Sequence, residues 1–137
     1  VVNILGKVAD DPKLSPRVAV FVGRSLRELE AFDKAADVLG KVPPPPPDLL
    51  MKKTSELQKD EDRLLVLFYR GAQLELARTH REAGKLNDAD EVLKKAMEGD
   101  AAYAKTAPDF RKEAVYLLEA RGAAEADPKA ATPHWVA

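Results

Sequence analysis

The sequence predicts an all-α fold built from antiparallel pairs of helices, and three observations lead to this expectation. The 137 residues are 45% hydrophobic and 33% charged, and Ala and Leu dominate an apolar set with few aromatic residues, which favours helix over sheet. Between Gly71 and Met97, apolar residues recur at helical spacing on either side of one glycine. The hexapeptides NILGKV and DVLGKV, at 3–8 and 37–42, are related by an offset of 37 − 3 = 34, which indicates an internal repeat.

The opening segment is interpreted as the second helix of a repeat whose first helix is absent. Residues 3–8 run into Pro12, as their echo runs into Pro43. The chain begins Val1-Val2 without Met and shows no signal-like segment. We therefore expect a fragment or a processed form, with further repeats upstream in the intact protein.

The next helix pair begins at Ser15-Pro16, because Ser caps a helix and Pro is tolerated in its first turn. The first helix is expected to run to about Glu30, and a turn and a second helix follow from Phe32 to Val42. Glu30 stands where the later pair has Gly84. Because a left-handed backbone costs a non-glycine residue roughly 1 kcal/mol or more, we expect a different turn geometry at Glu30.

The best-defined pair spans Gly71–Met97. Its first helix is expected to end at Gly84, which can adopt the left-handed conformation, and Asn87 is the expected N-cap of its second helix. Equivalent positions of the two pairs are related by an offset of 89 − 35 = 54. The matched positions are Val22, Gly23, Leu26, Phe32, Asp33, Ala35, Leu39 and Val42 in one pair, and Leu76, Ala77, His80, Leu86, Asn87, Ala89, Leu93 and Ala96 in the other.

An insertion at 43–62 separates the two pairs, since the offset of 54 exceeds the repeat offset of 34 by 54 − 34 = 20. The five prolines Pro43–Pro47 cannot be helical and are expected to form polyproline II. They serve either as a stiff connector or as a ligand for an SH3- or WW-type domain, and the lack of flanking Arg or Tyr favours the connector. Residues 48–59 form an extra helical turn or two, or else the next first helix begins early, near Asp60, and is long.

A third first helix is expected from Thr106-Ala107-Pro108-Asp109 to about Arg121. It repeats the first-helix spacing loosely, at Ala114, Val115, Leu118 and Gly122. Residues 123–137 are interpreted as a tail, with Trp135 as a packing anchor on the helices.

The Gly71–Met97 pair resembles the tetratricopeptide repeat (TPR), whose first helix carries Leu-small-x-x-aromatic and whose second carries small-x-x-x-large-x-x-Ala, with Gly at the turn. The matching residues are Leu76, Ala77, Gly84, Leu86, Ala89, Leu93 and Ala96, and His80 stands where the family has an aromatic residue. The resemblance implies a right-handed α-α superhelix, a TPR-like solenoid of about two full repeats with flanking half-repeats. It would form a single domain over 1–137, with the insertion at 43–62 and the tail at 123–137.

The sequence offers no catalytic constellation. There are two histidines, His80 and His134, and no HExxH motif, Gly-rich phosphate loop or Gly-x-Ser-x-Gly elbow. His80 lies at a packing position, and Asp88, Asp90 and Glu91 suit a helix start better than a calcium loop. The chain has no cysteine and thus no disulfide or thiolate metal site. We expect no enzyme activity, no cofactor and no metal.

The resemblance also implies a ligand-binding surface, because the first helices of TPR solenoids line a concave groove. On the groove-facing side of the first helices, Arg24, Arg27 and Glu28 recur at the same offset of 54 as Arg78, Arg81 and Glu82. The full candidate set is Arg17, Val20, Arg24, Arg27, Glu28, Gly71, Leu74, Arg78, Arg81 and Glu82, extended by Arg111 and Lys112.

Guanidinium groups hold carboxylates bidentately, so the hypothesis is that this groove binds an extended acidic or C-terminal carboxylate segment of a protein partner. The alternative is that the arginines pair with Glu28, Glu82 and their neighbours at helical spacing and only keep the surface soluble. The Asn residues of the family's carboxylate-clamp members are missing from the pattern.

The leading functional expectation is a non-catalytic protein–protein interaction module or scaffold. The alternative is an oligomerisation or regulatory domain of a larger multidomain protein, forming a homo-oligomer through exposed repeat ends. A net charge of −1 and the lack of stacking aromatic residues among the arginines argue against nucleic acid. No apolar run approaches the roughly 20 residues needed to span a bilayer. The compartment stays open, with the cytoplasm slightly favoured.

Overall fold

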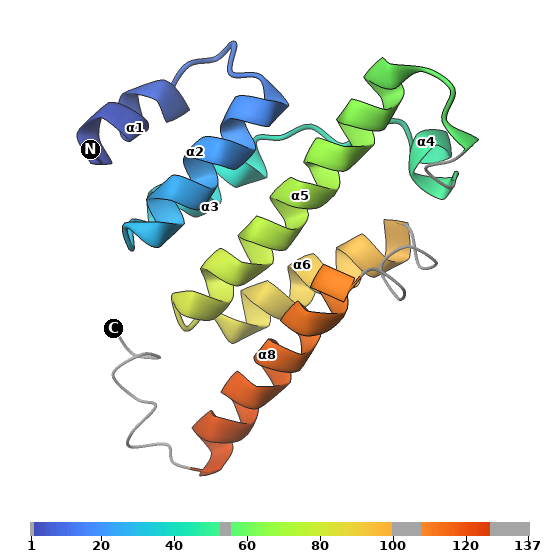
Figure 1. The fold of residues 1–137 in the computed structure, drawn as a ribbon. Helices are drawn as coiled ribbons and strands as arrows, with labels where there is room; N and C mark the ends of the chain where they lie inside the picture. Colours follow the sequence, from blue (N-terminus) through green and yellow to red (C-terminus); the bar gives the residue numbers. More distant parts are fainter. Residues whose placement is uncertain (1, 53–55, 100–107, 127–137) are drawn as a thin grey trace.

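The computed structural model describes residues 2–52, 56–99 and 108–126, which are mostly helical and contain no strand, so the all-α expectation is confirmed for them. The helices are α1 (Val2–Ala9), α2 (Pro16–Glu28), α3 (Phe32–Gly40), α4 (Pro47–Met51), α5 (Asp60–Glu82), α6 (Leu86–Gly99) and α8 (Pro108–Ala126) (Figure 1). The expected helix start at Thr106-Ala107, Trp135 and most of the expected tail lie outside the described residues.

Helices α2 and α3 form one hairpin, and α5 and α6 form a second with the same turn. Glu30 has a φ of 62° and Gly84 a φ of 81°. The N–H of Ala31 donates to Leu26 O, and the N–H of Lys85 donates to His80 O, at 2.8 Å in both turns. These bonds close the end of each first helix in the same way. The expectation of a different geometry at Glu30 is therefore wrong, because α3 packs on α2 and holds this residue in the left-handed region.

Small residues let the two helices of the first hairpin approach closely. A Cβ atom added to Gly23 on α2 would overlap Cγ and Cδ2 of Leu39 on α3. Leu26 and Ala35, which complete this contact, are both 0% exposed. In the second hairpin the matched positions Ala77, Ala89 and Leu93 are also buried. The small-against-large pattern in the sequence thus corresponds to real contacts in both hairpins.

The starts of these helices agree with the sequence in one case and differ in the other. The N–H of Val18 donates to Ser15 Oγ at 3.3 Å, so Ser15 caps α2 as expected. Asn87 is not an N-cap, because α6 begins one residue earlier, at Leu86. The side-chain oxygen of Asn87 accepts instead from Arg121 Nη2 on α8, at 3.5 Å.

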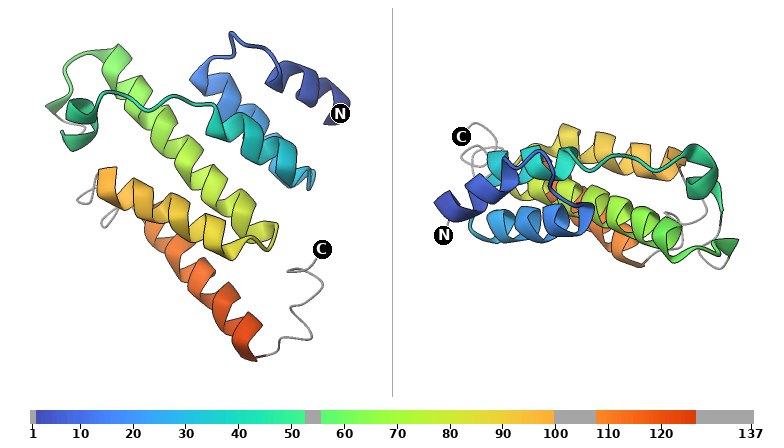
Figure 2. Two further views of the ribbon diagram at one scale, coloured as in Figure 1. Left: turned by 180° about the vertical axis from the view of Figure 1, so that it is seen from behind. Right: turned by 90° about the horizontal axis from the view of Figure 1, so that it is seen from above.

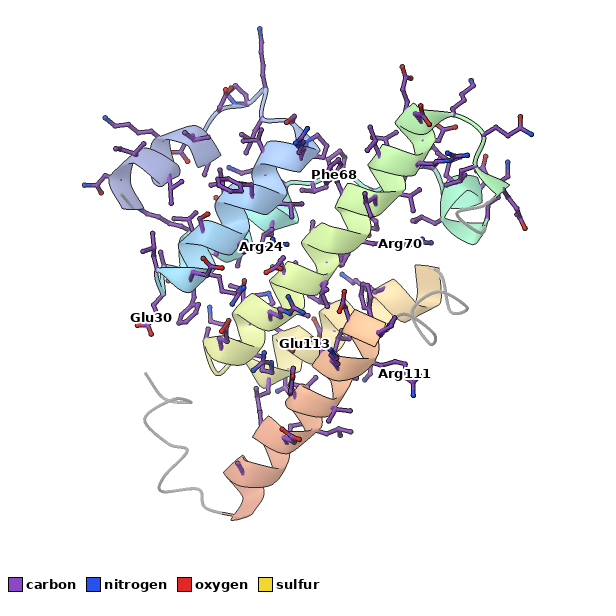
Figure 3. All side chains as sticks on the ribbon, in the orientation of Figure 1. Arg24, Glu30, Phe68, Arg70, Arg111 and Glu113 are labelled. Atoms are coloured by element: carbon purple, nitrogen blue, oxygen red, sulfur yellow. The ribbon has the colours of Figure 1, made fainter. Side chains whose placement is uncertain are left out.

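The inserted segment packs against the N-terminal half of α5. Only part of the proline run is non-helical, since Pro47 is the first residue of α4, where its fixed φ and missing N–H are tolerated. Helix α5 begins at Asp60 and spans 23 residues, as one alternative predicted, and the short helix α4 is the extra helical turn that the other predicted. Arg63 Nε donates to Leu57 O at 2.6 Å, and Arg70 Nη2 donates to Leu50 O at 3.3 Å. These two bonds tie the described part of the insertion to α5 (Figure 3).

The packing of one helix on the two helices of the preceding hairpin occurs twice along the chain. Helix α5 packs on both α2 and α3, and α8 packs in the same way on both α5 and α6 (Figure 2). One buried apolar cluster lies among α1, α2, α3 and α5, and the second lies among α5, α6 and α8. Because α5 contributes to both clusters, it joins the two hairpins.

Helix α8 continues past the expected turn at Gly122, which lies inside the helix. Among residues 108–123 of this helix, Phe110, Glu113 and Leu117 are buried, whereas Val115 and Leu118 are 50% and 69% exposed. The expected first-helix contacts at Val115 and Leu118 are therefore not made by any described helix.

Candidate functional site: a row of arginines over two buried glutamates

Two glutamates are buried between successive first helices. The side chain of Glu75 on α5 is 2% exposed and that of Glu113 on α8 is 1% exposed. Two arginines from α2 hold Glu75. Arg24 Nε lies 3.1 Å from its Oε1, and Arg27 Nε lies 3.1 Å from its Oε2. Each carboxylate oxygen thus receives its own charge-assisted hydrogen bond.

The same arrangement recurs one helix further along. Arg78 Nε on α5 lies 3.4 Å from Glu113 Oε1, and Arg81 Nε lies 2.5 Å from Glu113 Oε2. In both cases the arginines are three residues apart on one first helix, and the glutamate comes from the next one. Figure 3 shows Arg24 directed toward α5 and Glu113 directed toward it from the other side.

Further contacts join the two clusters. Arg78 Nη1 lies 3.2 Å from Glu75 Oε1, the oxygen that Arg24 also contacts. Arg27 Nη1 lies 2.9 Å from Glu82 Oε2. The guanidinium carbon of Arg81 lies 5.2 Å from the ring centroid of Tyr116, within reach of a cation–π interaction. We call Arg24, Arg27, Arg78 and Arg81 the arginine row.

The pairing explains how the carboxylates remain buried. An ionised carboxylate is very unfavourable in a dry interior unless opposite charges and hydrogen bonds compensate its desolvation. Burial of Arg27 opposes its protonation, but the hydrogen bond to Glu82 and the charges of Glu75 and Glu82 outweigh this effect and raise the pKa of Arg27. Arg27 therefore stays cationic at every physiological pH.

The structure brings together five of the predicted site residues, namely the arginine row and Glu82. Arg17, Glu28 and Arg111 are exposed and lie outside these ion pairs, and Arg111 points away from Glu113 (Figure 3). Leu74 does not line an open surface. It is 9% exposed and packs in the second apolar cluster with Phe110 and Leu117, because α8 covers that side of α5.

Glu75 and Glu113 are the site residues that the sequence-based prediction missed. Each directly precedes the two positions of the Leu-small motif, Leu76-Ala77 and Ala114-Val115. An acidic residue at the same place in two apolar stripes is the signal that could have identified them. The expected pairing at helical spacing describes only the Arg78–Glu75 contact, since the other contacts of the arginine row bridge different helices.

His80 is half-buried, and burial lowers its pKa more than the nearby Asp88 raises it. No group of three or more His, Asp or Glu side chains in the described part of the chain is placed to hold a metal ion. None of the described helices is both long enough and apolar enough to cross a membrane.

Comparisons with known proteins add no relative: no protein-family model, no curated protein and no solved structure matches this chain.

Proposed function

We propose that this chain is a TPR-like helical-repeat domain that acts as a non-catalytic protein-interaction module and binds an extended acidic segment through its arginine row. Two features support the repeat assignment. The hairpins α2–α3 and α5–α6 share one turn geometry, and the arginine pair occurs on both first helices at the same spacing. A row of first helices that carries the same cations twice suits a ligand that runs across several helices.

The observation that carries the proposal is the exposure of Arg24. Its side chain is 54% exposed although its Nε is bonded to Glu75. Arginine has five N–H donors, so the terminal N–H groups of Arg24 can still hold a partner's carboxylate. Arg17 lies two helical turns away on the same face of α2 and is exposed, which extends the cationic strip.

The buried glutamates offset part of the positive charge of the row, but they also preorganise it. They fix the guanidinium heads of the row in position, so that less side-chain entropy is lost when a ligand binds. Arg78 and Arg81 are 28% and 23% exposed, and they continue the strip from α2 to α5. An extended acidic segment would therefore cross from α2 toward α8.

Fluorescence anisotropy with a labelled peptide of about ten Glu and Asp residues tests the proposal, against a Gln/Ser peptide of equal length. The acidic peptide should bind more tightly, and more weakly as salt rises. Arg24→Gln should raise its Kd about three- to tenfold, which corresponds to roughly 0.7–1.4 kcal/mol for one exposed charge-assisted contact.

Lys41→Gln is the matched control, because it also removes one positive charge and leaves the arginine row intact. Lys41, the C-cap residue of α3, is 51% exposed, and its amine lies 3.4 Å from Asp37 Oδ2, one turn earlier. Equal binding of both peptides, or equal losses in the two variants, would remove the acidic-segment proposal.

A further inference from the structure

The two ends of the helix stack expose large apolar side chains. At one end, Ile4 on α1 and Phe21 on α2 are 68% and 65% exposed. At the other end, Tyr116 and Leu118 on α8 are 45% and 69% exposed. The internal repeat shows what should cover each of them.

The exposed face of α1 corresponds to a buried face of α3. The repeat offset of 34 relates Ile4 and Val8 to Val38 and Val42. Val38 on α3 and Val42, two residues after α3 ends, are 0% and 6% exposed, because both lie in the apolar cluster that α2 and α5 form with α3. Helix α1 contacts the first helix that follows it, α2, as α3 contacts α5. On the other side of α1, no described helix lies where a first helix would pack on its second helix. The bare face of α1 therefore fits a first helix.

The exposed face of α8 corresponds to a buried face of α5. Because the arginines hold Glu113 as they hold Glu75, the two glutamates are structurally equivalent. Counting from them, Val115 and Leu118 of α8 occupy the places of Ala77 and His80, where a first helix packs on its second helix. Val115 and Leu118 are exposed, so the bare face of α8 fits a second helix.

We infer that this domain assembles head to tail, with α8 of one copy packing against α1 of the next copy. The pair α8–α1 then repeats the packing of α2 on α3 and of α5 on α6. In the same repeat, each first helix packs on both helices of the preceding pair, so α2 of the incoming copy would pack on α8 as well. The contact thus continues an interface that the chain already forms twice within itself.

Side-chain chemistry at the junction supports this occupant. Glu75 stands three residues before Arg78, and the same place on α2 is Phe21, three residues before Arg24. On α8, the place of Arg24 and Arg78 is taken by Tyr116. The incoming α2 therefore brings Phe21 opposite Tyr116. Where the internal contacts pair Glu with Arg, the junction pairs two aromatic rings.

The α8 surface also has room for the incoming side chains. A shallow cavity of about 350 Å³ opens beside Tyr116 and is lined as well by Pro108, Arg111, Lys112 and Val115.

The two joined surfaces differ from each other, so the contact is heterologous and each copy keeps one free end. Assembly should therefore grow with concentration instead of stopping at a closed dimer.

Light scattering coupled to size-exclusion chromatography tests this inference on the full chain. The mass of the wild type should rise steadily with concentration above that of one copy. Phe21→Glu blocks one end and Leu118→Glu blocks the other, and both positions are exposed, so each variant should fold and remain monomeric. An equimolar mixture of the two variants keeps one intact junction and should double in mass, without growing further.

Each other result overturns the proposal. A wild type that stays monomeric up to millimolar concentration has no such junction. If either variant alone still forms dimers, the contact is between like ends. If the mixture stays monomeric while circular dichroism shows both variants folded, α8 and α1 do not pair. Leu118→Glu should still bind the acidic peptide, so this proposal and the proposed function can fail separately.

Cross-linking gives a second readout that does not depend on the charged variants. The chain has no cysteine, so single cysteines can be placed at will. Phe21→Cys and Tyr116→Cys, made in separate copies and mixed, should be joined by a short bismaleimide. The pair Lys41→Cys and Tyr116→Cys is the control and should remain unjoined. Equal yields of cross-linked product from both pairs would mean that the cross-links arise from random collision and not from the junction.

Discussion

At the scale of single residues, Glu75 and Glu113 determine the character of the site. Each is almost fully buried and each is held by two guanidinium groups from the preceding first helix. A buried ion pair adds little stability over a well-packed apolar pair, but removing one partner leaves uncompensated charge. The arginines therefore depend on the glutamates for their position.

Glu75→Ala should lower the free energy of unfolding by about 3 kcal/mol or more, because it leaves Arg24, Arg27 and Arg78 close together without their shared carboxylate. Denaturant titration followed by circular dichroism measures this loss. Glu28→Ala is the control, since Glu28 is exposed and outside the network, and its effect should stay within about 0.5 kcal/mol. A loss below about 1 kcal/mol for Glu75→Ala would contradict the role of the pairing.

Glu30 is a further residue whose environment is decisive, since its φ of 62° is unfavourable for a side chain with Cβ. Glu30→Gly should raise the free energy of unfolding by about 0.5–1 kcal/mol, the strain relieved less the added entropy of the unfolded chain. Gly84→Ala at the equivalent turn should act in the opposite direction, by about 1 kcal/mol. Thermal unfolding measures both. A loss of stability in Glu30→Gly would mean that the side chain, and not the backbone, holds the turn.

At the scale of elements, the hairpins are defined by close contact between a small residue and a large one. A Cβ atom at Gly23 would overlap the Leu39 side chain. The matched position in the second hairpin is Ala77, which has a Cβ and is 0% exposed. The first hairpin therefore has the tighter crossing. Packed interiors resist added volume, so even one methyl group there must move a helix or change a rotamer.

Gly23→Ala should lower the free energy of unfolding by about 1–3 kcal/mol, although alanine is the better helix former. Gly122→Ala is the control, because Gly122 lies within α8 with no atom near its absent Cβ. That change should be stabilising by about 0.5–1 kcal/mol. Denaturant titration compares the two. If both substitutions stabilise the protein, the close approach of α2 and α3 does not limit the packing.

At the scale of the whole molecule, α5 joins two hairpins that would otherwise be separate clusters. It contributes to both buried apolar groups and carries half of the arginine row. The stack presents the row along its first helices and leaves exposed apolar side chains on α1 and α8. The proposed acidic-segment site and the proposed head-to-tail junction thus both rest on one repeated contact.

Local signals were sufficient for much of this architecture. Apolar spacing, the Ser15 cap and Gly84 predicted helices whose observed bounds lie within a few residues of the expected ones. The repetition of the arginine row was also visible, because it depends only on counting along the chain. The prediction that Leu74 lines an open groove was wrong, because helical periodicity alone does not say which helix packs on a given side of α5.

The sequence by itself determined the all-α class, the hairpins and which arginines share a face, since each follows from interactions among residues close together in the chain. Only the tertiary structure decided what those arginines contact. Arg24 and Glu75 are 51 residues apart, and they meet because burial of apolar surface sets α2 beside α5. The same packing holds Glu30 in a conformation that its own preference opposes, because the energy of many buried contacts exceeds the strain at one residue.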